Sequence, residues 1–153
     1  MKLKLMGRNH SDELYTPDTA LDILLPYLPK DKTLFECAVG TGKLKDKMER
    51  DGYEVVTSDD FFNEYPEYDI LVTNPPFSLK DSFLEEAYKR GKPFAILLPI
   101  TALEGLKRQR MYREHGIEIL FPLRRTDFNG KGSPWFYTAW FCWKLLPKQL
   151  NFI

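Results

Sequence analysis

Short runs of hydrophobic residues alternate along the chain with segments of helical spacing, and this alternation predicts an α/β protein. The runs are bounded by polar or turn residues, which is typical of strands buried on both faces of a parallel sheet. A longer stretch, residues 135–146, is aromatic on both faces and predicts a buried final strand. The other strands are predicted at residues 33–39, 53–58, 70–72, 94–100 and 117–121.

Four helices are predicted, and apolar residues three and four positions apart mark the first of them and the one at residues 80–90. The first follows Tyr15, with Thr16 as its expected N-cap and Pro17 at its first helical position, and its apolar residues run from Ala20 to Leu28. The first twelve residues are basic and unpatterned, so we expect them to be flexible. The remaining helices are expected at residues 43–50, 80–90 and 104–115.

Length and composition narrow the class of protein. The 153 residues predict a single domain over residues 1–153. Lys plus Arg number 22 and Asp plus Glu number 22, so a nucleic-acid partner would need a local basic patch. Cys37 and Cys142 lack metal-type spacing, which favours reduced core cysteines and no metal site. No apolar run approaches the roughly 18 residues of a membrane span, so we expect a cytoplasmic protein with no membrane partner.

The strongest chemical signal follows the strand predicted at residues 70–72, where the chain reads Asn74-Pro75-Pro76-Phe77. Two prolines cannot donate ladder hydrogen bonds, so the strand ends there in a stiff turn. Asn74 offers an acceptor and a donor, and Phe77 offers a flat apolar face. Such a turn at the carboxyl end of a strand can hold a planar amide or an exocyclic amine. A proline-rich strand exit without a ligand is the alternative interpretation.

A second candidate site is the turn after the first predicted strand. Gly40 and Gly42 permit positive φ and close approach of a ligand, and the helix that follows presents free N–H groups. A phosphate-binding P-loop would need Gly at position 37 and Ser or Thr at position 44, and Cys37 and Leu44 exclude it. The pattern Asp/Glu-x-x-x-Gly-x-Gly, which begins at Glu36, instead resembles the glycine turn of proteins that bind S-adenosylmethionine.

Taken together, these segments resemble the amino-directed methyltransferases that use S-adenosylmethionine, and in particular the compact N6-adenine DNA methyltransferases of phages and large DNA viruses. The resemblance runs from Tyr15 to about Lys144. It implies a Rossmann-like sheet, mostly parallel with an antiparallel last strand, and transfer of a methyl group to the N6 amine of adenine in DNA. The segments that carry it are Tyr15-Thr16-Pro17, Glu36-x-x-x-Gly40-x-Gly42, Asp59-Asp60-Phe61 and Asn74-Pro75-Pro76-Phe77.

The resemblance also implies catalytic roles for the turn after residues 70–72. The Asn74 amide oxygen and the Pro75 carbonyl would accept hydrogen bonds from the target amine. Pro76 belongs to the same rigid turn, and Phe77 would stack on the flipped-out base.

The implied cofactor site uses all four segments. Tyr15, Thr16 and Pro17 would close over the methionine end of S-adenosylmethionine, although helix capping explains Thr16 and Pro17 equally well. Asp59 would accept the ribose hydroxyls, or is a solvated turn residue. Phe61 or Phe62 would pack on the adenine, or belongs to the core. The full implied set is Tyr15, Thr16, Pro17, Glu36, Ala38, Gly40, Gly42, Asp59, Asp60 (on the adenine amine), Phe61 and Asn74.

Two features depart from the full-size family. The family usually has Pro at the position of Cys37. Only nine residues separate Asp59 from Asp69, fewer than a helix-containing crossover of about ten to twelve residues and a strand need. We therefore expect the family's third strand and its helix to be missing, which places the strand at residues 53–58 near an edge of the sheet.

The connection before the final strand is the candidate substrate surface. It is basic, contains glycine and leads into aromatic residues, so it can contact phosphates and stack a base. A structural hairpin loop is the alternative, and the basic helix at residues 104–115 is a second place for a patch. The candidate substrate-binding residues are Phe77, Arg124, Arg125, Lys131, Trp135 and Phe136.

Several functions remain open at this point. The same turn could methylate an adenine in RNA or a protein glutamine, because the target amines look alike to Asn74. A catalytically inactive module that binds S-adenosylmethionine or a partner is the alternative of another class. Because small enzymes of this kind often borrow surface from a second subunit, a homodimer or a partner subunit for target recognition is also expected.

Overall fold

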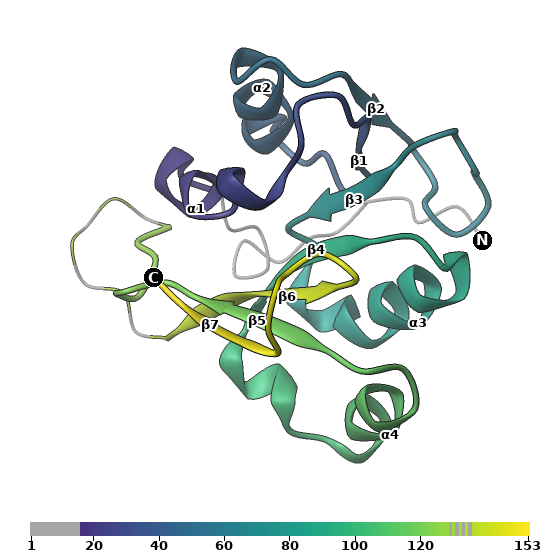
Figure 1. Ribbon diagram of the computed structural model, residues 1–153, viewed down its shortest axis with the longest axis vertical. Coiled ribbons are helices and arrows are strands. Elements are labelled where there is room, and N and C mark those ends of the chain that lie inside the picture. Colours follow the sequence, from purple (N-terminus) through teal and green to yellow (C-terminus); the bar gives the residue numbers. More distant parts are fainter. Residues whose placement is uncertain (1–15, 129, 131, 133, 135) are drawn as a thin grey trace.

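One sheet of seven strands organises the protein in the computed structural model, which describes residues 16–128, 130, 132, 134 and 136–153 (Figure 1). The strand order is β2-β1-β3-β4-β6-β5-β7, and every neighbouring pair is parallel except the two that β6 makes. The predicted Rossmann-like fold is therefore confirmed. The strands are β1 Leu34–Glu36, β2 Val55–Thr57, β3 Ile70–Thr73, β4 Phe94–Pro99, β5 Glu118–Phe121, β6 Thr138–Trp143 and β7 Leu150–Phe152.

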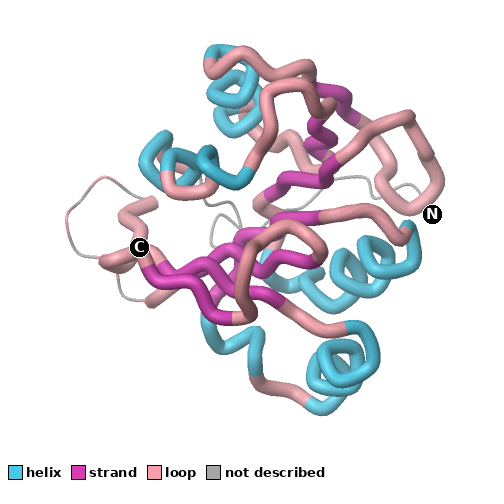
Figure 2. The backbone as a smooth tube through the Cα atoms, viewed as in Figure 1, coloured by secondary structure: helices cyan, strands magenta, loops and turns pink. Residues whose placement is uncertain are grey.

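Helices cover both faces of the sheet, so that the described chain forms three layers (Figure 2). Alternate side chains of one strand enter opposite cores: Ile70 and Val72 of β3 pack with α1 and α2, whereas Leu71 packs with α3 and α4. The α-helices are α1 Asp18–Asp22, α2 Lys43–Arg50, α3 Lys80–Arg90 and α4 Leu106–His115, and the 3₁₀ helices are η1 Leu25–Tyr27, η2 Phe77–Leu79 and η3 Ile100–Leu103.

The first helix is shorter than its apolar spacing predicted. It ends at Asp22, and a separate 3₁₀ turn at Leu25–Tyr27 follows, because Pro26 has no N–H to continue the helix. The predicted capping by Thr16 is wrong. Pro17 is the N-cap residue and makes no side-chain capping bond, which leaves the Thr16 hydroxyl for another partner.

The carboxyl-terminal part of the sheet corrects a second prediction. The antiparallel strand is present as β6, but it is not the last, because β7 follows and pairs parallel with β5. The hydrophobic pattern did not predict β7, because this strand buries its polar residue and exposes its apolar ones. Asn151 is buried, whereas Leu150 and Phe152 are exposed. The Asn151 amide is satisfied by the carbonyls of Ile119 and Lys148, at 3.2 and 2.8 Å.

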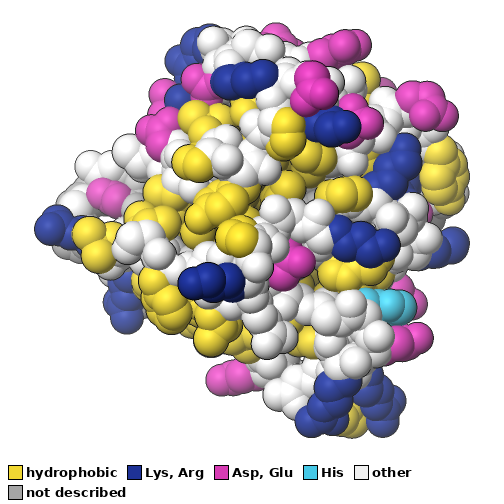
Figure 3. Space-filling model, viewed as in Figure 1, with side chains coloured by type: hydrophobic (Ala, Val, Ile, Leu, Met, Phe, Trp, Pro, Cys, Tyr) yellow, Lys and Arg dark blue, Asp and Glu magenta, His cyan; other side chains and the backbone are white. Residues whose placement is uncertain are grey.

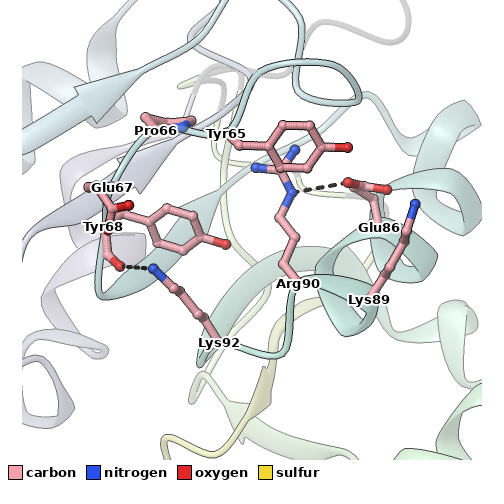
Figure 4. Close-up of a pocket in the computed structure, with 8 residues that line it drawn as sticks. All are labelled: Tyr65, Pro66, Glu67, Tyr68, Glu86, Lys89, Arg90 and Lys92. Carbon is pink, nitrogen blue, oxygen red and sulfur yellow. Dashed lines mark hydrogen bonds and ion pairs between the residues drawn. The ribbon is translucent and has the colours of Figure 1, made fainter.

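The expected loss of the third strand agrees with the structure, in which β2 is an edge strand and a loop joins it to β3. Arg90 on α3 anchors this loop (Figure 4). Its guanidinium donates to the carbonyls of Phe61 and Glu64, the latter at 2.9 Å, and pairs with Glu86 at 3.1 Å. It also lies 4.5 Å from the centre of the Tyr65 ring. A buried cation thus holds the segment that lacks strand pairing.

Within the part of the chain that the structure describes, no helix combines the length and the apolar character needed to cross a membrane.

Candidate active site

A cavity of about 300 Å³ opens at the carboxyl ends of β1, β2 and β3. Ligands of open α/β sheets bind at this edge, because the loops that leave the strands diverge there. Its walls come from three separate segments of the chain and from the start of α3. The lining residues are Cys37, Ala38, Val39, Gly40, Ser58, Asp59, Phe61, Pro76, Leu79 and Phe83.

The turn between β1 and α2 brings backbone to the cavity edge. Gly40 and Gly42 have φ of 55° and 83°, backbone angles that residues other than glycine rarely adopt. The Gly-x-Gly spacing predicted such a turn. The Gly42 N–H closes the turn on the Val39 carbonyl at 2.8 Å, and Gly42 is the N-cap residue of α2. Ala38 and Gly40 line the cavity, whereas Gly42 does not.

Glu36 is buried beneath that turn and does not line the cavity. Its Oε1 accepts hydrogen bonds from the Ala38 N–H, at 2.9 Å, and from the Thr73 hydroxyl. Burial raises the pKa of Glu36 from 4.5 to about 7, although both hydrogen bonds favour the charged form. Thr73 lies in no motif, so sequence reasoning missed it; it precedes Asn74 and its bond to Glu36 couples the glycine turn to the proline turn.

The proline turn follows β3 immediately. Asn74 is half-buried, and its Nδ2 donates to the Thr16 hydroxyl at 2.9 Å, across 58 positions of sequence. Pro75 is buried, and Pro76 forms part of the cavity wall. Two segments that the resemblance grouped into one site, Thr16-Pro17 and Asn74-Pro75-Pro76-Phe77, therefore meet.

Aromatic side chains gather next to this turn. Phe77 begins the 3₁₀ helix η2, and its ring meets that of Phe136 edge to face, with 6.0 Å between the centres. Phe136 in turn stacks parallel on the buried Phe128 at 5.8 Å. Sequence reasoning selected Phe77 and Phe136 but missed Phe128, which lies in the basic loop and had no motif to identify it.

Polar residues after β2 mark the other end of the cavity. Asp59 is exposed at its edge. Ser58 Oγ is buried in the wall and has no hydrogen-bond partner among the residues that the structure describes. A buried hydroxyl without a partner is costly, and a polar ligand in the cavity would satisfy it.

Asp60 bonds only within the protein, whereas Phe61 serves both the core and the cavity wall. The Asp60 carboxylate accepts from the Phe62 N–H at 3.2 Å and from Asn63 Nδ2 at 2.8 Å, closing its own turn, and it does not line the cavity. Phe61 is buried against Phe83, with ring centres 5.2 Å apart, yet it also forms part of the wall. Both interpretations of Phe61, core residue and ligand contact, are thus compatible with its position.

The candidate substrate loop is described only in part. Arg124 and Arg125 are exposed, and Arg125 Nη1 reaches the Pro134 carbonyl at 3.4 Å. Tyr15, Lys131 and Trp135 lie outside the described residues. Lys and Arg side chains also gather over α4 in Figure 3, where Arg110 and Arg113 are exposed.

Comparison with known proteins identifies a shared fold at low sequence identity. No protein-family model and no curated protein matches the chain. Among solved structures, a protein of Listeria monocytogenes described as a class I S-adenosylmethionine-dependent methyltransferase superposes with a TM-score of 0.62 at 13% identity, over 97% of this chain and 67% of its own. A Pyrococcus horikoshii protein described as an RNA methyltransferase superposes with a TM-score of 0.60 at 16% identity, over 90% of this chain and 88% of its own.

A third match is the modification subunit of a type I restriction enzyme described for Vibrio vulnificus, with a TM-score of 0.54 at 14% identity over 90% of this chain. The chain spans only 44% of that subunit's length. The chain has the class I methyltransferase fold. In this methyltransferase fold the cavity lies where the strands of the parallel half end, between the glycine turn and the proline turn.

Proposed function

We propose that the protein transfers a methyl group from S-adenosylmethionine to the N6 amine of adenine in DNA. The observation that carries the proposal is the meeting of Asn74 with Thr16 beside a cavity whose wall includes Pro76 and Gly40. An amide held on a rigid turn, next to a cavity of nucleoside size in a methyltransferase fold, fits a target amine better than any other ligand class that the residues offer.

The residues that line the cavity fit the cofactor. Gly40 presents backbone without a side chain, Asp59 offers a carboxylate for two ribose hydroxyls, and Phe61 and Phe83 give an apolar wall for a base. The unsatisfied Ser58 hydroxyl supports a polar ligand here. When bound, S-adenosylmethionine supplies an electrophilic methyl group on a positively charged sulfur.

The chain's own part in the chemistry is orientation. An adenine N6 lone pair is delocalised into the ring and is a poor nucleophile. Hydrogen bonds from the two N–H groups of N6 to the Asn74 amide oxygen and the Pro75 carbonyl would favour a pyramidal nitrogen, whose lone pair is then available. A strong base is not needed, because the proton leaves after the nitrogen has become cationic. Much of the rate then comes from positioning.

The aromatic cluster of Phe77, Phe136 and Phe128 supports a base as the target. A base taken out of a duplex loses its stacking partners, and Phe77 would replace one of them. A protein glutamine would gain less from these rings, because its amide has a much smaller flat surface. Arg124 and Arg125 are exposed in the same loop as Phe128 and would contact the phosphates. This local positive charge is needed because the chain as a whole has no net charge to attract nucleic acid.

One experiment separates the candidate functions. Labelled methyl transfer from S-adenosylmethionine is measured in parallel to duplex DNA, single-stranded DNA, RNA and protein, with binding of S-adenosylhomocysteine followed by calorimetry. The proposal predicts transfer to DNA, recovered as N6-methyladenine after hydrolysis. Transfer to RNA or protein alone would support methyl transfer as the reaction but would contradict DNA as the substrate. Cofactor binding without any transfer would favour a binding module.

A further inference from the structure

We infer that Thr16 is a positioning residue, whose hydroxyl sets the direction of the Asn74 amide for the reaction. The inference rests on the proposed function and adds a role that neither helix capping nor contact with the cofactor supplies. Its basis is the 2.9 Å hydrogen bond from Asn74 Nδ2 to Thr16 Oγ1, formed between two segments 58 residues apart.

The planarity of the amide makes this bond decisive. Once Nδ2 is held by Thr16, the carbon–oxygen bond of the same group must point away from Thr16 in the amide plane. If the amide turned over, it would offer N–H groups to a target amine, and two donors would then face each other. While the Thr16 hydroxyl accepts from Nδ2, as it does in the structure, Asn74 stays in the one orientation that can present its oxygen to an N–H group.

The surroundings of Thr16 make the bond a fixed one. Thr16 is only 7% exposed, so water does not compete freely for its hydroxyl. The residue that follows, Pro17, restricts the backbone of Thr16 to extended conformations, and the structure has Pro17 itself as the N-cap of α1. Because helix capping is not the function of the Thr16 hydroxyl here, the bond to Asn74 is the role that the described residues give it.

A double-mutant cycle tests the inference. Thr16→Val removes the hydroxyl at nearly constant shape, and Thr16→Ser keeps it. We expect kcat to fall about ten-fold in Thr16→Val and to stay within about two-fold of wild type in Thr16→Ser. The dissociation constant of S-adenosylhomocysteine should change by less than about two-fold in both. In an Asn74→Ala background, Thr16→Val should cause no further loss, because the group through which Thr16 acts is gone.

The possible outcomes distinguish this inference from the proposed function. A wild-type protein that transfers no methyl group overturns both. An active wild type with unchanged kcat in Thr16→Val overturns the inference alone, as does an equal loss in the Asn74→Ala background or a loss confined to cofactor affinity. Thermal unfolding of each variant is recorded alongside. If Thr16→Val does not fold, Thr16→Ala replaces it in the same cycle, since it removes the hydroxyl without adding a methyl group.

Discussion

The Thr73 hydroxyl donates a hydrogen bond to the Glu36 carboxylate, so the ends of β1 and β3 are joined directly beneath the candidate site. The carboxyl group is almost completely buried, and burial raises its pKa to about 7. The folded protein therefore holds a proton on Glu36 over a pH range in which the unfolded chain releases it.

This difference predicts a loss of stability with rising pH. Between the unfolded pKa of 4.5 and the folded pKa of about 7, the folded state binds more protons, so the free energy of unfolding falls as pH rises and levels off above pH 7. The contribution of Glu36 to that fall is about 3 kcal/mol. Glu36→Gln keeps an acceptor for Thr73 and Ala38 and should abolish the dependence. Urea unfolding at pH 5, 6, 7 and 8 measures it, with the exposed Glu54→Gln as the control. An unaltered pH profile in Glu36→Gln would show that the proton is held elsewhere.

Gly40→Val should prevent binding of the cofactor. Gly40 has a positive φ and lines the cavity, so a branched side chain there is strained and occupies the space of a ligand. Calorimetry with S-adenosylhomocysteine should show the effect. Gly91→Val is the matched control, because Gly91 also has a positive φ, 70°, but ends α3, where a Cβ atom would have open space within 4 Å. Unchanged affinity in Gly40→Val would show that the cofactor does not bind at this turn.

The basic loop before β6 should carry the salt-dependent part of nucleic-acid binding. Each of Arg124, Arg125 and Lys131 that binds a phosphate should contribute about one unit to the slope of log affinity against log salt. Fluorescence anisotropy with labelled DNA at several salt concentrations measures the slope for the triple alanine variant, which should be shallower than that of wild type. The comparison is Arg110→Ala with Arg113→Ala on α4, the other basic surface in Figure 3. A slope that responds only to the α4 pair would move the interface to that helix.

Arg90→Met should destabilise the fold. The guanidinium is 6% exposed, holds the carbonyls of Phe61 and Glu64, and pairs with Glu86. Its removal leaves Glu86 buried without its partner and frees the loop that stands in for a strand, at a cost of about 3 kcal/mol or more. Denaturant unfolding measures this, with the exposed neighbour Lys89→Met as the control. A cost below about 1 kcal/mol would mean that the loop is held by other interactions.

The sequence was informative where residues impose a local constraint and silent where distant residues decide. Two prolines ended β3 at the predicted place, and the Gly-x-Gly spacing correctly indicated a turn with positive φ. The bond between Thr16 and Asn74 could not be predicted by spacing, because local capping chemistry explained Thr16 equally well. The strand β7 was missed for a similar reason. Its buried residue, Asn151, is polar, and its side chain is satisfied by the carbonyl of Ile119, which is far away in the sequence.

The rate of methyl transfer by Asn74→Ala tests the central claim most directly. Alanine removes the amide without disturbing Pro75 and Pro76, and loss of one preorganised hydrogen-bonding group of this kind typically costs about 10²–10³ in rate. The account predicts such a loss in kcat, with binding of S-adenosylhomocysteine left largely intact. An Asn74→Ala variant as active as the wild type would contradict it, because the proline turn would then be only the exit of a strand.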